Sequence, residues 1–190
     1  MMKDVFITLP ELDGKRFKLR GVRSDDSEAL FEVYSDEKAV PFFNGDNCHG
    51  DDFHYTTKKR MNEAVEFWLW SYEKRYFVRW AIADKSSDRA IGTIELFHRD
   101  SDRDVYDNCG LLRLDLKSEY ETRDAIAEIL SLVCPPAFDL FYCDKIATKI
   151  KPFAAERLAA AKSAGFTPSP APLIGDDGTE YFDYYILRSE

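Results

Sequence analysis

The stretch LLRLDLKSEYETRDAIAEILSLV, residues 111–133, decides the fold because it contains a strand that runs directly into a helix. Leu112, Leu114 and Leu116 alternate with polar residues, which is the period of a strand with one buried face. From about Thr122 the apolar residues recur at helical spacing instead. A strand that ends at a helix N-terminus presents unpaired backbone N–H groups, which suit an anionic ligand such as a diphosphate.

Strands and helices follow one another in a mixed order along the rest of the chain. Pro135 and Pro136 cannot donate backbone hydrogen bonds, so we predict that they end the helix before a short piece from Ala137 to Tyr142. Further strands are predicted at residues 17–20, 76–83, 90–97, 145–150 and 181–188, and further helices from Ala29, after Thr56 or Thr57, and from Ala154. This order predicts one domain, residues 1–190, of α/β (α+β) class, with a twisted mixed sheet and helices on both faces.

The composition excludes several classes of protein. With 26 Lys and Arg against 35 Asp and Glu, the net charge of −9 argues against nucleic acid as the partner and suits a cationic amine. No apolar run is long enough to span a membrane, and the first ten residues, with Asp4 and Pro10, do not resemble a signal peptide. The four cysteines form no C-x-x-C pair, so we expect a cytoplasmic protein with reduced thiols. The sequence does not indicate an oligomeric state.

Most common ligand motifs are absent. The glycines form no G-x-G-x-x-G, and Gly45 and Gly50 have P-loop spacing but are followed by Asp51 and Asp52 instead of Lys and Ser or Thr. The loop from Cys48 to His54 gathers residues that can bind metals, yet a solvated loop is the preferred interpretation, and no metal site is predicted. The aromatic stretch 68–80 has the spacing of a helix stripe followed by a strand, so we expect core packing instead of base stacking.

Four segments resemble, in order, the GNAT superfamily of N-acetyltransferases, especially its ribosomal-protein alanine acetyltransferase branch. These segments are RFKLRGVRSDDSEALFEVYSDE at residues 16–37, WAIAD followed by IGTIELF at 80–97, AFDLFYCDKIATKI at 137–150, and AGF at 164–166. The resemblance implies a mixed sheet of about seven strands between helices. It also implies acetyl-CoA as cofactor and co-substrate, and a primary amine on a small molecule or a peptide as acceptor.

The resemblance also locates the cofactor on the strand–helix junction. The family's pantetheine arm pairs with the strand end here formed by Leu114 and Leu116, and its diphosphate lies on the loop that follows. The cofactor-binding residues implied there are Lys117, Thr122, Arg123, Asp124, Ala125 and Ile126. The family pattern R/Q-x-x-G-x-G/A becomes Glu121-Thr-Arg-Asp124-Ala-Ile126, so acid stands near the diphosphate and Lys117 or Arg123 would have to offset it. Ser118 and Glu121 also fit a capping box, which would need no ligand.

The remaining site residues lie outside this loop. The family's Asn and Ser at the thiol end of the cofactor fall on Ala154 and Arg157, and the Tyr that protonates the thiolate in other branches falls on Ala161. Glu95 and Asp115 are the predicted catalytic residues, as general bases for the acceptor amine, although a solvent-facing strand residue is the preferred interpretation of each.

Three hypotheses follow. The first is an acetyl-CoA-dependent N-acetyltransferase, and it requires that the crevice beside Leu114 and Leu116 admit the thioester arm. The second is a GNAT-fold binding or regulatory protein that has lost CoA, as Glu121, Asp124 and Ile126 suggest. The third is a thioester site with relocated phosphate contacts.

Overall fold

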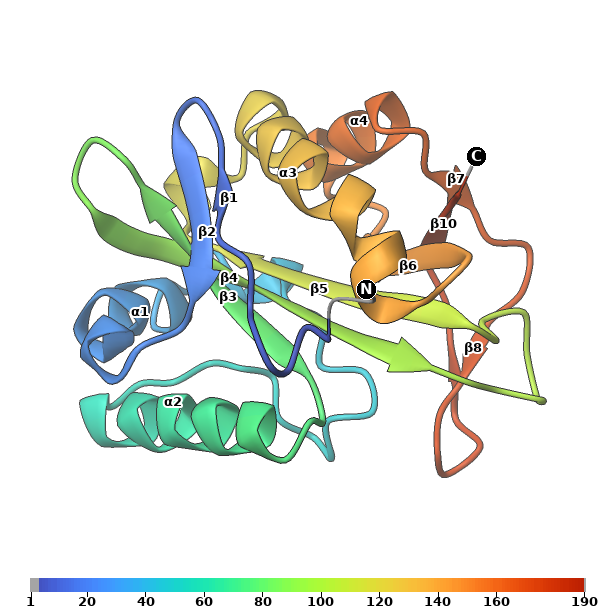
Figure 1. The fold of residues 1–190 in the computed structure, drawn as a ribbon, viewed down its shortest axis with the longest axis horizontal. Coiled ribbons are helices and arrows are strands. Elements are labelled where there is room, and N and C mark those ends of the chain that lie inside the picture. Colours follow the sequence, from blue (N-terminus) through green and yellow to red (C-terminus); the bar gives the residue numbers. More distant parts are fainter. Residues whose placement is uncertain (1–3, 190) are drawn as a thin grey trace.

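The computed structural model describes residues 4–189, in which one large sheet separates two pairs of helices (Figure 1). In these residues the sheet has eight strands in the order β1-β2-β3-β4-β5-β6-β10-β7, and β8 pairs with β9 apart from it. The strands of the large sheet are β1 Leu12–Asp13, β2 Phe17–Gly21, β3 Val78–Asp84, β4 Arg89–Arg99, β5 Cys109–Leu116, β6 Lys145–Lys149, β7 Thr167–Pro168 and β10 Tyr184–Arg188, and the small pair is β8 Leu173–Ile174 and β9 Glu180–Tyr181.

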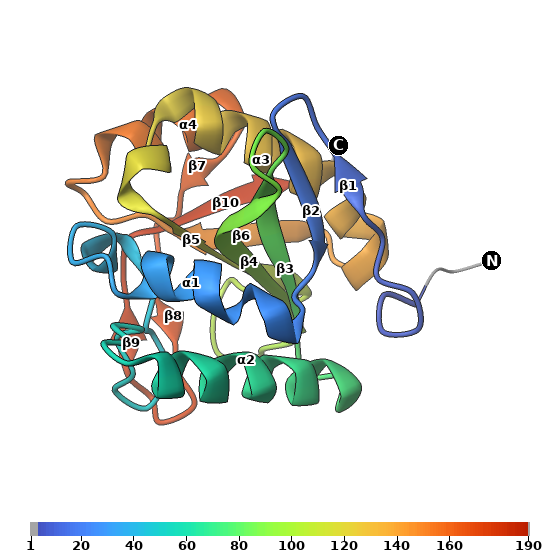
Figure 2. The ribbon, with the colours of Figure 1, turned by 90° about the vertical axis from the view of Figure 1, so that its left-hand side faces the viewer.

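Helices α3 and α4 cover one face of the sheet and α1 and α2 cover the other, as the two views show (Figures 1 and 2). The helices are α1 Ser27–Tyr34, α2 Lys58–Glu73, α3 Arg123–Phe141 and α4 Ala155–Ser163, with 3-10 turns at η1 Ser24–Asp26, η2 Val40–Phe42 and η3 Ser118–Tyr120. The mixed sheet with helices on both faces confirms the predicted fold class. Within residues 4–189 no helix is both long and apolar enough to cross a membrane.

Strand β5 has a different environment on each of its sides. It pairs with β4 along its whole length but with β6, its only parallel neighbour in the described residues, no further than Leu112 and Thr148. Beyond that point β5 and β6 are not paired, so Leu114 and Leu116 lie in the part of β5 that has no partner on the β6 side. Leu112 and Leu114 belong to the core cluster that contains the α3 residue Ile126. Arg113 and Asp115 alternate with them along the strand, so they lie on the opposite face of the sheet, toward α1 and α2.

Local capping signals locate two of the helices. Thr57 and Thr122 are the N-caps of α2 and α3, and their side-chain oxygens accept hydrogen bonds from Arg60 N at 3.2 Å and Ala125 N at 3.4 Å. Thr57 is one of the two residues predicted to cap α2, and α3 begins where the helical spacing predicts it.

The predicted end of α3 at its two prolines is wrong. The helix passes through Pro135 and Pro136 and ends at Phe141, with Tyr142 as a left-handed cap. Ala137 and Phe141 are buried in the core, so tertiary packing stabilises the last turns although the prolines cannot donate their hydrogen bonds.

Candidate functional site

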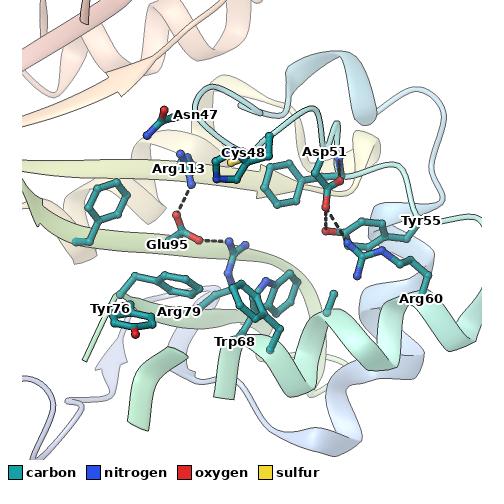
Figure 3. Close-up of a pocket in the computed structure, with 16 residues that line it drawn as sticks. Asn47, Cys48, Asp51, Tyr55, Arg60, Trp68, Tyr76, Arg79, Glu95 and Arg113 are labelled. Carbon is teal, nitrogen blue, oxygen red and sulfur yellow. Dashed lines mark hydrogen bonds and ion pairs between the residues drawn. The ribbon is translucent and has the colours of Figure 1, made fainter. Parts of the chain in front are cut away.

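A cavity of about 580 Å³ lies between α2, the sheet and the loop of residues 44–57 (Figure 3). We call it the aromatic pocket because aromatic rings form much of its wall, namely Phe53, Tyr55, Phe67, Trp68, Tyr76, Phe77 and Phe97. Ala64 stands one helical turn before Trp68 and contributes only a methyl group to the wall. A largely apolar cavity of this size with a few polar groups is typical of a small-molecule or side-chain binding site.

The prediction of core packing for the aromatic stretch is right in part. Trp68 and Trp80 are buried, whereas Phe67 and Tyr76 are 52% and 60% exposed and line the pocket. Helical and strand spacing indicate which face is apolar, but they do not distinguish a packed core from the wall of a cavity.

Three charged side chains from adjacent strands form the floor of the pocket. Arg79 of β3, Glu95 of β4 and Arg113 of β5 stand directly opposite one another in the sheet register. Glu95 Oε1 accepts a hydrogen bond from Arg113 Nη1 at 2.6 Å, and its Oε2 accepts one from Arg79 Nη2 (Figure 3). Each carboxylate oxygen therefore faces a guanidinium group. We refer to these three residues as the charged floor.

Both predicted catalytic carboxylates are buried, each only 2% exposed, so the solvent-facing alternative is wrong for Glu95 and Asp115. Burial opposes ionisation of Glu95, but the charges of Arg79 and Arg113 outweigh it and hold the Glu95 pKa below its ordinary value. For Asp115 burial dominates and raises the pKa, although Arg79 opposes it and the Tyr34 hydroxyl donates a hydrogen bond at 2.8 Å. Asp115 is thus the stronger proton acceptor, but it does not line the pocket.

Arg79 has an unused hydrogen-bond donor. Its side chain is 2% exposed, and its Nε has no partner among residues 4–189. The guanidinium also lies over the Trp68 ring, with its Cζ atom 4.1 Å from the ring centroid. Neither arginine of the charged floor was predicted as a site residue. Their signal was available, because Arg79 and Arg113 are charged residues within otherwise apolar strands.

The loop over the pocket is tied to it, not freely solvated as predicted. Asp51 accepts hydrogen bonds from Arg60 Nη2 at 2.8 Å and from the Tyr55 hydroxyl at 3.1 Å. Cys48 and Asp51 line the cavity. In the described part of the chain no three His, Cys, Asp or Glu side chains gather as a metal site.

The crevice between the separated ends of β5 and β6 is almost filled. Its cavity volume is about 10 Å³, and the residues around it include Leu114, Ile126, Thr148, Arg157 and Ala161. A cavity of this size is at the lower limit for a single water molecule.

An ion pair closes this crevice at the start of α3. Arg157 Nε donates to Glu121 Oε2 at 2.8 Å, and Arg157 Nη2 donates to Glu121 Oε1. Each side chain is 6% exposed. The capping box predicted for Ser118 and Glu121 is therefore wrong, since Thr122 caps α3 and the Glu121 carboxylate binds Arg157. Lys117, one of the two cations that could offset this acid, pairs with Glu32 at 3.3 Å and Glu119 at 2.9 Å.

The backbone donors at the start of α3 are partly occupied by the chain itself. Arg123 N donates to the Glu156 carboxylate at 2.7 Å, and Ala125 N donates to the cap. Asp124 adds a further acid to this turn. Leu114, Leu116 and Ile126, the implied contacts of the cofactor, are buried in the core.

One mixed sheet thus lies between two pairs of helices, with the ends of β5 and β6 unpaired beside the N-terminus of α3 and the aromatic pocket on its other face. The acetyltransferase (GNAT) domain model matches residues 16–167, so the chain belongs to the GNAT family and is an N-acetyltransferase by class. No curated protein sequence matches the chain.

Solved structures confirm this fold. The acetyltransferase of Salmonella typhimurium that modifies the N-terminal serine of ribosomal protein L7/L12 has a TM-score of 0.66 at 12% identity over 95% of this chain and 100% of its own. The ribosomal-protein-S5-alanine acetyltransferase of Vibrio fischeri has a TM-score of 0.62 at 14% identity, over 93% and 94%. The L7/L12 α-N-protein acetyltransferase RimL, in complex with CoA, has a TM-score of 0.70 at 12% identity, over 94% and 98%.

The residues around the crevice do not fit CoA in this structure. A volume of about 10 Å³ leaves no room for a pantetheine arm. A diphosphate would meet Asp124 and Glu156 at the start of α3, while Arg157, the nearest buried cation, is already paired with Glu121. The crevice that the family resemblance implies for the cofactor is thus closed, and the aromatic pocket is open.

Proposed function

We propose that this chain transfers an acetyl group from acetyl-CoA to a primary amine that binds in the aromatic pocket. The observation that carries the proposal is the pocket itself, which lies on the side of β5 that faces α1 and α2 and offers about 580 Å³ above the charged floor. Acetyl-CoA supplies the activated acetyl group when it is bound. The pocket walls and Arg113 hold and orient the acceptor.

The protonation state of the acceptor favours a peptide α-amino group over a lysine side chain. Glu95 has both oxygens held by arginines, and Asp115 lies outside the pocket lining, so neither presents a free carboxylate to the ligand. An α-amino group has a pKa of about 7.7–8.0, against about 10.4 for lysine, so a substantial fraction is neutral at pH 7 without a base. The ribosomal-protein acetyltransferases of the same fold act on N-terminal residues, which agrees with this choice.

The two buried carboxylates differ in their affinity for a proton. The pKa of Asp115 is raised by burial, whereas the pKa of Glu95 is lowered by Arg79 and Arg113. Because neither is presented to the ligand, we expect neither Asp115→Asn nor Glu95→Gln to abolish kcat at pH 7. Glu95→Gln should chiefly raise KM for the acceptor, because it disturbs the arginines that form the floor.

The test is acetyl transfer to short peptides with free or blocked N-termini, followed by intact-mass spectrometry. The proposal expects one added acetyl group on the free α-amine, none on the blocked peptide, and loss of the product in Ala64→Trp, which fills the pocket. Acetylation of the blocked peptide at lysine would overturn the choice of acceptor. No product with any amine would overturn the reaction.

The filled crevice favours a second candidate, a GNAT-fold binding protein that uses the aromatic pocket without CoA. Isothermal titration of the wild-type chain with CoA separates the two candidates. Saturable binding supports the transferase, and no heat at millimolar CoA supports the binding protein.

A further inference from the structure

Two residues that depart from the family pattern form one buried ion pair. Glu121 stands where the pattern has Arg or Gln at the diphosphate, and Arg157 stands where the family has a small polar residue at the thiol end. They are 36 residues apart in sequence, yet Arg157 Nε and Nη2 bind the two oxygens of the Glu121 carboxylate. The two departures from the family pattern therefore belong together, because each side chain neutralises the charge of the other.

The ion pair is anchored on a third segment. Arg157 Nη1 donates to the carbonyl oxygen of Phe42 in η2 at 3.2 Å, and the guanidinium lies 5.5 Å from the centroid of the Phe42 ring. Phe153 packs edge-on against the same ring at 5.5 Å. The pair thus joins the start of α3, helix α4 and the segment after α1.

A second bridge crosses between the separated strands. The carbonyl oxygen of Asp46 accepts a hydrogen bond from Arg113 Nη2 of β5 at 2.8 Å. The Asp46 carboxylate binds Lys149 Nζ of β6 at 2.7 and 2.8 Å. The chain therefore spans the gap between β5 and β6 with its own groups on the side of α1 and α2 as well.

We propose that the Arg157–Glu121 pair and CoA exclude one another, with the pair as the internal occupant of the cofactor crevice. The inference rests on the proposed function in one respect, namely that the acetyl donor uses this crevice. A pantetheine arm needs the volume that the Arg157 side chain fills, and a diphosphate would gain no charge from an arginine that is already neutralised. CoA then binds only molecules in which the pair is open, and its apparent affinity is lowered by that fraction.

The experiment is titration of the chain with CoA alone. The double variant Glu121→Gln with Arg157→Ser restores residue types of the family pattern at both positions and leaves no unpaired charge. The matched control is Arg20→Ser with Asp26→Asn, which removes a bidentate buried ion pair, at 2.6 and 2.8 Å, on a different part of the sheet. We expect at least a tenfold gain of CoA affinity over the wild type in the first double variant and none in the control.

Each result has one meaning. Equal CoA affinity in wild type and double variant overturns the exclusion and leaves the proposed function standing. No CoA binding in either chain overturns the exclusion and the acetyl donor together. A gain of CoA binding without acetyl transfer supports the exclusion and overturns the proposed function. If the double variant does not fold by circular dichroism, the near-isosteric Glu121→Gln with Arg157→Gln replaces it, with a smaller gain expected because the crevice opens less.

Discussion

The aromatic pocket and the cofactor crevice share strand β5 but differ in how they use charge. On one side Arg113 pairs with Glu95 at the bottom of a cavity of about 580 Å³, so the ions form a floor and leave the space above them open. At the other side Arg157 pairs with Glu121 inside the crevice, where about 10 Å³ remains. The difference teaches that a fold of this family can leave the acceptor pocket open while its own side chains fill the crevice that the cofactor would occupy.

The size of the helical residues explains the contrast. Helix α2 presents Ala64 to the pocket, so the aromatic side chains around it enclose a cavity instead of filling one. Helix α4 presents Arg157 to the crevice, where an extended side chain with a hydrogen-bonded head fills the volume. Substitutions at these residues test whether the pocket is open and the crevice is filled.

The largest effect is expected from breaking the ion pair on one side only. Arg157→Ala removes the partner of the Glu121 carboxylate, which is 6% exposed in the intact pair, and should lower the free energy of unfolding by about 3–5 kcal/mol. Urea denaturation measures this loss. Lys59→Ala, in a pair that is exposed at 87% and 50%, is the control and should change stability by less than about 1 kcal/mol. A similar small loss for Arg157→Ala would mean that the crevice is not held closed by this pair.

Enlarging an alanine should lower the free energy of unfolding more in the crevice than in the pocket. Ala161→Leu puts extra methyl groups into a filled crevice and should cost about 1–3 kcal/mol of unfolding free energy. Ala64 is itself 2% exposed but borders the open pocket, so Ala64→Leu should cost less stability than Ala161→Leu. The same variant should weaken acceptor binding, which titration measures. Equal losses of stability would remove the distinction between the two regions.

The buried carboxylates Glu95 and Asp115 should contribute to the pH dependence of stability with opposite signs. The Asp115 pKa is raised in the folded chain, so the folded state binds this proton more tightly and gains stability as pH falls through that pKa. The Glu95 pKa is lowered, so its contribution is present above its unfolded value of about 4.3 and is lost only below it. Asp115→Asn lacks this gain, so it should lose more stability than the wild type as the pH falls from 7 through the Asp115 pKa. Parallel stability curves for the two proteins would contradict the raised pKa.

Local rules were enough to predict most of the framework. The alternation of Leu112, Leu114 and Leu116, the cap at Thr57 and the start of α3 near Thr122 depend on neighbours in sequence, and the structure confirms them. The end of α3 at Pro135 was predicted by the same kind of rule and failed, because burial of the following turns against the sheet outweighs the lost hydrogen bonds.

The site was harder to predict because its meaning depends on partners that are far apart in the chain. Glu121 was identified as an acid at the diphosphate loop, but nothing local indicates that Arg157 would neutralise it. Glu95 was identified as a candidate base, yet its function depends on Arg79 and Arg113 on two other strands. A single sequence shows which residues carry charge, and the register of the sheet decides which of them meet.

The smallest effect is expected on the rate at which a thiol reagent modifies Cys48. This rate reports on the pocket and on the crevice in the same chain. Cys48 lies on the wall of the aromatic pocket, and burial raises its pKa, so little thiolate is present at pH 8 and labelling by a disulfide reagent should be slow. Cys109 and Cys134 are buried with pKa values raised to about 12, so they should react only on unfolding. An acceptor that binds in the pocket should slow the labelling of Cys48 severalfold, whereas CoA bound to the Glu121→Gln, Arg157→Ser variant should leave the rate unchanged, with Cys48→Ser as the blank. If CoA protected Cys48 as strongly as the acceptor does, pocket and crevice would be one continuous site, and the contrast between the two sides of β5 would have to be given up.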